Sequence, residues 1–249
     1  MSLGVILGYI ASVVAGLVLA NRYQLWRLAK PATWPRLLMY HSIANEAPTG
    51  MNTTPAKFDA QLAWLKQQGY IFCTVSELLT TSQPKAIAIT FDDGFANNYH
   101  NAFPLLKKYQ AKATIYLAPE IATIDKLTTA QITEMQDSGL IEFGAHSVTH
   151  INLLQTAAEP ARQEIIGSKQ QVEALTGVAC RSFAYPFGRF SDETVELVRA
   201  AGFSSAVTTK KKIIANLTAQ AFTIPRISTH GAMDSMQFYI AVSRGRYKF

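Results

Sequence analysis

The sequence has few charged residues and few cysteines, and it contains no long run of one charge. Charged residues make up 16% of the 249 residues, although the net charge is +6. This composition excludes a disordered chain and a highly charged nucleic-acid-binding protein. The two cysteines, Cys73 and Cys180, match no zinc or redox spacing. Buried free thiols are expected, and a single disulfide is the alternative in an oxidising compartment.

Charge is also missing from the beginning of the chain. No charged residue occurs from Leu3 to Ala20, and the stretch is apolar. As a helix it would be about 27 Å long, close to the thickness of a hydrocarbon core. Aromatic and basic residues follow as far as Lys30. We therefore expect residues 1–30 to form a transmembrane anchor with its basic flank; a signal peptide cleaved after Ala20 is the alternative.

The side of the membrane on which the rest of the chain lies is left open. Positive charge follows the apolar stretch and does not precede it, which favours a cytoplasmic domain. Large domains are nevertheless exported despite such flanks, so an exported domain is the alternative. The densest basic run, from Lys210 to Lys212, predicts a solvated loop, with contact to anionic lipid headgroups as the second interpretation.

Residues 31–249 predict one α/β domain. Pro31 and Pro35 end any helix that continues from the anchor. Expected strands are 36–41, 86–91, 113–117, 140–145, 182–185, 204–207 and 222–227. Expected helices are 55–68, 98–109, 128–137, 160–175 and 192–201, with glycines just beyond four of them and Ser191 as an N-cap. Seven strands separated by helices favour a largely parallel sheet, which as a closed barrel would carry its chemistry at the carboxyl ends of the strands.

Two adjacent carboxylates, Asp92 and Asp93, follow the expected strand 86–91. Two like charges at the end of a buried strand repel each other and lose hydration, so a cation should compensate them. A helix cap is the structural alternative, but it would use only one carboxylate. The pair therefore indicates a bound cation.

Two of the five histidines in the chain, His146 and His150, follow the expected strand 140–145. A spacing of four puts both rings on one side of a helical turn, as paired metal ligands require. Together with Asp93 they would form a two-histidine, one-carboxylate metal set with open positions. We expect one divalent ion there, zinc first and nickel, cobalt or iron as alternatives. One aspartate would ligate it, and the other would take a proton from water that attacks an amide or ester carbonyl.

The segments TFDDG (residues 90–94) and HSVTH (residues 146–150) resemble the first two motifs of the polysaccharide deacetylase family, also called the NodB-homology or carbohydrate esterase 4 family. The resemblance extends over residues 36–227. It implies a distorted (β/α)7 barrel in which Asp92 is the catalytic base and Asp93, His146 and His150 are the metal ligands.

The third family motif, Arg-x-Pro-Tyr, is matched here by Ala184-Tyr185-Pro186-Phe187, so its arginine and tyrosine are both replaced. The resemblance assigns substrate and oxyanion contacts to Tyr185, Pro186 and Phe187, with the Phe187 N–H as the oxyanion donor. A tight turn is the alternative interpretation. The family arginine orients the base, and we expect Arg226 to replace it.

The resemblance also calls for a general acid, which the family usually supplies from a Leu-x-His motif near the C-terminus. Here LMYH, which ends at His41, lies near the N-terminus, as in the branch that deacetylates poly-β-1,6-N-acetylglucosamine. His41 is therefore the expected acid, and His230 is the alternative. Aromatic residues that could form a sugar platform are Trp64, Phe95, Tyr99 and Tyr185, although the spacing of Trp64 fits core packing better.

The resemblance implies a metal-dependent hydrolase that removes N-acetyl groups from an amino sugar of a surface polysaccharide or its lipid-linked precursor. The N-terminal helix would hold it at the membrane, and no nucleic-acid partner is expected. Two alternatives stay open. One is a carbohydrate O-deacetylase with the same metal and base, and the other is a non-catalytic glycan-binding barrel in a biosynthetic complex.

Overall fold

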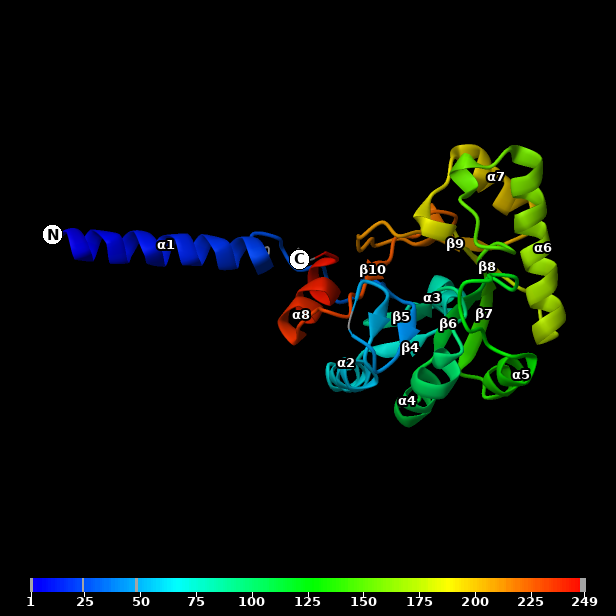
Figure 1. The fold of residues 1–249 in the computed structure, drawn as a ribbon, viewed down its shortest axis with the longest axis horizontal. Coiled ribbons are helices and arrows are strands. Elements are labelled where there is room, and N and C mark those ends of the chain that lie inside the picture. The colour runs from blue at the N-terminus through cyan, green and yellow to red at the C-terminus, as the bar shows by residue number, and fades with distance from the viewer. Residues whose placement is uncertain (1, 24, 48, 247–249) are drawn as a thin grey trace.

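The computed structural model describes residues 2–23, 25–47 and 49–246. A parallel sheet lies at the centre of the domain, and helices surround it (Figure 1). Its strand order is β10-β1-β5-β6-β7-β8-β9, and β4 pairs with the first half of β5. The strands of this sheet are β1 (Arg36–Tyr40), β4 (Ile71–Cys73), β5 (Ala86–Phe91), β6 (Ala113–Leu117), β7 (Ile141–Ala145), β8 (Ser182–Ala184), β9 (Ser205–Val207) and β10 (Ile227–Ser228).

The two edges of this sheet are joined by the segment 224–228. Ile224 forms a parallel bridge with Val207 of β9, and Ile227 of β10 pairs with Leu38 of β1. The sheet therefore curls into a distorted (β/α) barrel, which confirms the predicted fold class. The predicted bounds 222–227 of the last strand are wrong. Pro225 has no N–H to donate to a ladder, so only a bridge and the two residues of β10 pair.

Five predicted helices are present with small changes in their ends. They are α2 (Pro55–Gln67), α4 (Phe103–Tyr109), α5 (Thr129–Asp137), α6 (Ala158–Thr176) and α7 (Asp192–Ala200). Ser191 caps α7 by accepting a hydrogen bond from the Thr194 N–H, and Gly177 ends α6 with a φ of 72°. The expected helix 98–109 is only half α-helical, because it begins as the π-helix η1 (Asn98–Ala102).

Several short elements were not predicted. They are β4, the small parallel pair β2 (Ser42–Ile43) and β3 (Asn52–Thr53), α3 (Val75–Thr80), α8 (Ser235–Arg244), and the 3-10 turns η2 (Leu153–Gln155), η3 (Pro186–Gly188) and η4 (Thr218–Gln220). Most of these elements are shorter than the window in which a helical or strand period can be recognised.

The strands are buried on both faces, as expected for a parallel sheet covered by helices. In β5 the odd positions Ile87, Ile89 and Phe91 belong to the large core under the helices. Ala86 and Ala88 belong to a smaller core that also contains Val207 and Ile224 from the far side of the sheet. Side chains alternate along a strand, so the next even positions of β5 also point into the barrel. Cys73 and Cys180 are buried free thiols, as expected.

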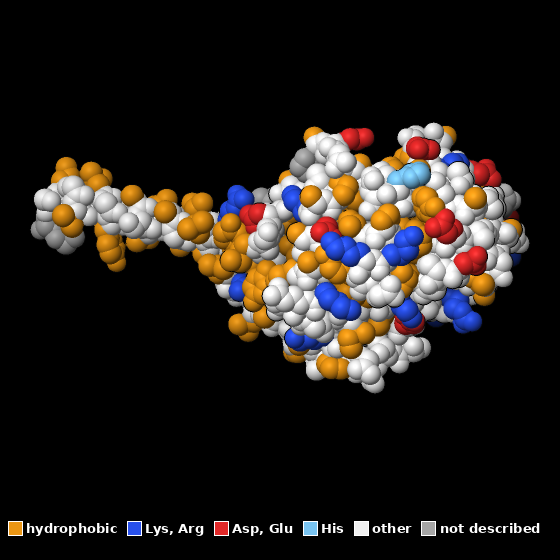
Figure 2. Space-filling model, turned by 90° about the horizontal axis from the view of Figure 1, so that it is seen from below, with side chains coloured by type: hydrophobic (Ala, Val, Ile, Leu, Met, Phe, Trp, Pro, Cys, Tyr) orange, Lys and Arg blue, Asp and Glu red, His pale blue; other side chains and the backbone are white. Residues whose placement is uncertain are grey.

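The helix α1 (Leu3–Tyr23) projects away from the barrel and has no buried residue (Figure 1). Figure 2 shows that hydrophobic side chains line much of its length. Its length and mean hydropathy of 2.4 would allow it to cross a membrane, and a signal sequence would have the same properties. Contacts beside α8 fix its junction with the barrel: Arg22 lies 3.7 Å from Asp234, and the Lys30 N–H donates to the Ser243 carbonyl.

Candidate metal centre

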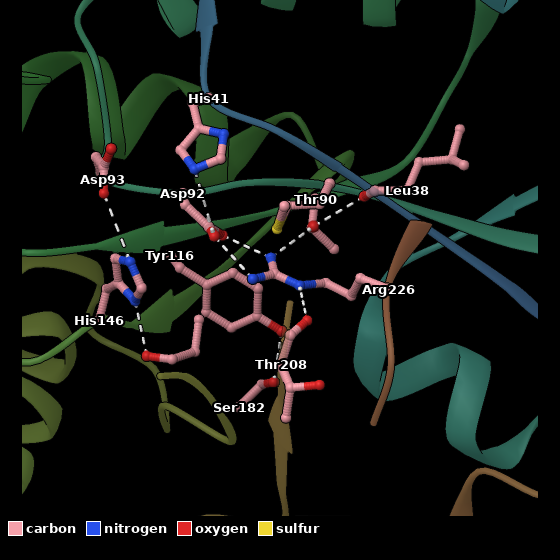
Figure 3. A network of polar contacts seen from close by, with 12 residues as sticks. Leu38, His41, Thr90, Asp92, Asp93, Tyr116, His146, Ser182, Thr208 and Arg226 are labelled. Carbon is pink, nitrogen blue, oxygen red and sulfur yellow. Dashed lines mark hydrogen bonds and ion pairs between the residues drawn. The ribbon is translucent and has the colours of Figure 1, made fainter. Parts of the chain in front are cut away.

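Polar side chains that follow the strands β1, β5 and β7 meet at the carboxyl edge of the sheet, where β6 lies between β5 and β7 (Figure 3). His41 follows β1, the two aspartates follow β5, and His146 follows β7. The register pairs Tyr40 with Phe91, which brings His41 next to Asp92. The parallel arrangement therefore gathers residues that lie more than a hundred positions apart in the sequence.

The Asp92 side chain points into the barrel, as the even positions of β5 do, and a buried arginine binds it. Both Asp92 oxygens accept hydrogen bonds from Arg226, at 2.6 Å from Nη1 and 2.7 Å from Nη2. Arg226 also donates to Thr90 Oγ1 and to the Thr208 carbonyl, each at 3.0 Å, and lies over the Tyr116 ring. Burial alone would raise the pKa of Asp92, but the Arg226 guanidinium outweighs it and holds that pKa well below its usual range. Asp92 is therefore a carboxylate at neutral pH.

The pKa of Asp93 is shifted in the opposite direction to that of Asp92. Burial, together with the negative charge of Asp92, raises the pKa of Asp93 to about 7, and Arg226 offsets only part of this. Its Oδ1 atom is buried and has no hydrogen-bond partner among the described residues. This oxygen lies 3.5 Å from Nε2 of His146 and 3.3 Å from Nε2 of His150. The three side chains offer ligand atoms that all lie within 4.8 Å of one another, so they could hold a metal ion.

Both histidine rings are neutral, and each directs its Nε2 atom towards Asp93 Oδ1. The His146 Nδ1–H donates to the Ala184 carbonyl at 2.7 Å, which leaves Nε2 unprotonated and facing Asp93. Burial lowers the pKa of His146 to about 3, and it also lowers the pKa of His150. The contacts with Asp93 are therefore not ion pairs. One carboxylate oxygen without a partner and two neutral imidazoles fit a divalent transition metal.

The predicted helical turn between the two histidines is wrong. Residues 146–150 form an irregular loop, in which Ser147 and His150 have φ values of 57° and 61°. Two left-handed residues turn the chain back, so the rings lie 4.8 Å apart without a helix. Glu164 of α6 supports the loop by accepting hydrogen bonds from the N–H groups of Val148 and Thr149.

Backbone strain is concentrated at this site. Six described non-glycine residues have a positive φ, and four of them are Asp93, Ser147, His150 and Phe187. Each such residue costs about 1–3 kcal/mol, which the surrounding structure must offset. Strain of this kind is typical of functional sites, where side-chain direction matters more than local stability.

The structure separates the two candidate acids. His41 Nε2 lies 3.9 Å from Asp92 Oδ2, on the same edge as the two aspartates. Burial lowers the pKa of His41, and the negative charge of Asp92 opposes this effect. His230 lies in the loop after β10, where its Nδ1 accepts the Ala232 N–H. Burial and then the charges of Lys211 and Lys57 lower the pKa of His230, so lysines and not Asp92 are its charged neighbours.

The turn Tyr185–Phe187 lies beside the histidine loop, but its two aromatic rings point in opposite directions. The Phe187 ring is 57% exposed and packs edge-on against His150 at 4.5 Å. The Tyr185 side chain is 0% exposed, and its hydroxyl donates to the Phe222 carbonyl. A sugar platform that includes the Tyr185 ring is therefore a wrong interpretation. Trp64 packs against Phe238 of α8, in agreement with a packing role.

Other residues that shape the site were not predicted. Thr90 and Thr208 hold the Arg226 side chain; Thr90 begins the TFDDG segment, whereas nothing in the sequence around Thr208 indicates a place at the site. Three asparagines, Asn97, Asn98 and Asn101, contact the segment that follows β1. These three could have been noticed, because asparagine is unfavourable within a helix and two of them fall in the first turn of the expected helix 98–109, with the third directly before it.

Comparisons with known proteins agree with this arrangement. A family model described as polysaccharide deacetylase matches residues 80–206. The chain is 34% identical over 188 residues to YxkH of Bacillus subtilis (strain 168), an alignment that covers 73% of this chain and 66% of the relative. It is 28% identical over 197 residues to the poly-β-1,6-N-acetyl-D-glucosamine N-deacetylase of Staphylococcus epidermidis, covering 71% and 67% of the two chains. The chain thus spans about two thirds of the length of these relatives.

A solved structure is similar over more of its length. It is the Streptococcus pyogenes deacetylase PplD in complex with acetate, with a TM-score of 0.77 and 28% identity. The similarity covers 86% of this chain and 99% of that one. The part of the chain beyond α1 therefore corresponds to nearly all of that structure.

Proposed function

The chain belongs to the polysaccharide deacetylase family, and we propose that it hydrolyses N-acetyl groups of an amino sugar with a divalent metal held by Asp93, His146 and His150. The observation that carries the proposal is the contrast between two adjacent aspartates. Arg226 keeps Asp92 ionised, whereas Asp93 has a buried oxygen without a partner beside two neutral imidazoles. Titratable neighbours whose pKa values are pushed apart are suited to different roles, here a base and a ligand.

In the proposed reaction, a bound divalent ion, with zinc as our first expectation and nickel, cobalt or iron as alternatives, supplies Lewis-acid polarisation of the acetyl carbonyl and of water. Asp92 takes a proton from the attacking water. In its protonated form His41, whose Nε2 lies 3.9 Å from Asp92 Oδ2, gives a proton to the leaving nitrogen as the C–N bond breaks, and the proton taken up by Asp92 then restores it. The Phe187 N–H is the proposed donor to the carbonyl oxygen as that atom gains negative charge. The products are acetate and a free amine.

The substrate class rests on the names of the relatives. One is named as a poly-β-1,6-N-acetyl-D-glucosamine N-deacetylase, and the similar solved structure is a deacetylase that contains acetate. We propose an N-acetylhexosamine in a surface polysaccharide or in its lipid-linked precursor. Residues 31–249 would form the catalytic domain.

We expect the purified protein to release acetate from N-acetylglucosamine oligomers and to release much less after treatment with a chelator. The assay measures acetate and free amine together, on matched N-acetyl and O-acetyl oligomers and on lipid-linked N-acetylglucosamine. Adding back zinc, nickel, cobalt or iron(II) in turn should restore the rate and identify the effective ion. Acetate release from the O-acetyl substrate alone would replace the proposal by an O-deacetylase.

Metal content separates catalysis from a non-catalytic glycan-binding barrel. The catalytic proposal predicts about one equivalent of metal in the protein and a strong decrease in the Asp93→Asn variant. Elemental analysis of both proteins measures this without an activity assay. A protein without metal and without acetate release would support the non-catalytic alternative.

We also propose that α1 anchors the catalytic domain in the membrane. The helix is apolar from Leu3 to Ala20 and has no buried residue, and the Arg22–Asp234 contact and the Lys30 bond to α8 join the chain to the barrel at and beyond its end. Arg36 strengthens this junction, because its guanidinium donates to the carbonyls of Lys30 and Val242. Arg22, Arg27 and Lys30 beyond the span favour a domain on the cytoplasmic side.

We expect the intact protein to sediment with membranes and a variant without residues 2–23 to remain in the supernatant. Mass spectrometry of the mature protein then distinguishes an anchor from a signal peptide, because cleavage would remove about 2 kDa, at roughly 110 Da per residue. Protease treatment of sealed vesicles reports the side of the membrane. A mature chain that begins after Ala20 would overturn the anchor.

A further inference from the structure

His41, the proposed acid, lies at the site without a hydrogen bond to its ring among the described residues. The ring atom Nε2 of His41 lies 3.9 Å from Asp92 Oδ2, a distance that is too long for a hydrogen bond. His41 also lies outside the regular strand, because β1 ends at Tyr40. With its side chain only 14% exposed, the place of the ring depends on the packing around it and on where its backbone lies.

The backbone after β1 is held by three asparagine side chains, which we call the asparagine clamp (Asn97, Asn98 and Asn101). Asn98 Nδ2 donates to the His41 carbonyl at 2.8 Å. Asn97 accepts the Ile43 N–H at 3.0 Å and donates to Ser42 Oγ at 2.9 Å. Asn101 Nδ2 donates to the Ile43 carbonyl at 2.7 Å. Every residue from 41 to 43 therefore receives at least one hydrogen bond from the clamp.

The π-helix η1 explains how one short segment supplies this clamp. A π-helix has a wider turn than an α-helix and usually occurs as a single turn at a functional site. Asn98 and Asn101 belong to this turn, and Asn97 directly precedes it. Asn98 and Asn101 are unfavourable within an α-helix, so at these two positions the sequence favours amide contacts with the segment after β1 over helix stability.

Asn98 is the member of the clamp that acts on His41 itself. Its side chain is 0% exposed, and its Oδ1 atom is buried without a hydrogen-bond partner among the described residues. Its other contact is a long one of 3.4 Å from Nδ2 to Asn97 Oδ1. A buried oxygen without a hydrogen bond is unfavourable, so the benefit of this side chain must come from its NH₂ group. That group donates to the His41 carbonyl.

We infer that Asn98 is a positioning residue that sets the place of the His41 ring beside Asp92, so that the ring can protonate the leaving nitrogen. The inference rests on the proposed function, because it requires His41 to be the acid. Displacement of a catalytic group by about 1 Å can cost about 100-fold in rate. Loss of the Asn98 bond should therefore impair proton donation without removing metal or base.

The test compares Asn98→Ala with the wild type in the full-length, metal-loaded protein on two substrates. An N-acetylglucosamine oligomer needs its leaving nitrogen protonated, whereas 4-nitrophenyl acetate releases a stable phenolate without an acid. We expect kcat for the oligomer to fall about 10–100-fold with KM nearly unchanged, and the rate on the aryl ester to change less than about 3-fold. Asn216→Ala, which changes an exposed asparagine in the loop before η4, is the matched control and should alter neither rate.

A double variant separates this inference from the proposed function. Adding Asn98→Ala to His41→Ala should cause no further loss, because the two residues act through one proton transfer. Equal losses on both substrates, or an added loss in the double variant, would overturn the positioning role and leave the proposed function intact. Full oligomer activity in His41→Ala would overturn the proposed acid, and the inference with it. If Asn98→Ala does not fold, Asn98→Ser serves the same comparison, because its shorter side chain does not reach the His41 carbonyl.

Discussion

Asp92→Asn should lower kcat for acetate release from an N-acetylated oligomer by about 10³-fold, within the range by which general acid–base catalysis accelerates reactions. The amide has nearly the shape of the carboxylate, so the side chain should keep its place, although the buried Arg226 guanidinium loses its counter-charge. It cannot take a proton, and its NH₂ group would face an Arg226 nitrogen that now donates to Oδ2. The measurement is acetate release at saturating substrate. Activity within a few-fold of the wild type would show that Asp92 is not the base.

The control for this experiment is the neighbouring aspartate. Asp92→Asn should keep its metal, since Asp92 lies outside the Asp93, His146 and His150 group. Asp93→Asn should lose both metal and activity. Two adjacent carboxylates with the same substitution and different metal contents would separate a base from a ligand. If Asp92→Asn also lost its metal, its low activity would not demonstrate a base.

The longer strands and the residues directly after them could be predicted because both depend on local sequence, whereas β2, β3 and β4 are too short to show a strand period. The run 86–91 has no charge and then meets Asp92 and Asp93, so its burial and its end are both visible. A parallel sheet places the carboxyl ends of neighbouring strands along one edge, which brings His41 to Asp92 without further information. This part of the site follows from strand period and strand order.

The remaining parts depend on contacts that local sequence does not encode. The left-handed conformations of Ser147 and His150 are unfavourable for both residue types, so the spacing of the two histidines suggested a helical turn that is absent. The asparagine clamp depends on a π-turn, which has no recognisable sequence period. Tyr185 has the sequence position of a site residue, but its ring turns into the core.

Arg226 is the clearest example of a site residue whose contacts local sequence does not encode. It was expected at the site only as a replacement for the missing family arginine, and its two bonds to Asp92 join residues 134 positions apart. The contact is possible because the segment 224–228 closes the barrel between β9 and β1. Pro225, which shortens the last strand, directly precedes Arg226 in this segment.

Arg226→Met should abolish most of the activity and destabilise the protein by about 3–5 kcal/mol, because it leaves a buried carboxylate without its partner. Arg226 is 0% exposed, and in the wild type its guanidinium bonds both oxygens of the Asp92 carboxylate. Arg226→Lys should recover little, since an ammonium group cannot form the two parallel bonds. Chemical denaturation of the metal-free proteins at pH 7 measures the change in the free energy of unfolding.

The pH dependence of this stability change gives the sharper test. In the wild type the folded pKa of Asp92 is lower than in the unfolded chain, so the pair stabilises the fold above about pH 4, and this contribution decreases as the pH falls towards the folded pKa. In Arg226→Met, burial should raise the folded pKa above the unfolded value. Its destabilisation relative to the wild type should therefore be largest at neutral pH and decrease steadily on acidification, because the folded variant takes up a proton at Asp92 where the folded wild type does not. Asp92→Asn should remove most of the effect of Arg226→Met in the double variant, because residue 92 then carries no charge that needs the guanidinium. A destabilisation independent of pH would mean that Arg226 acts through packing and not through Asp92.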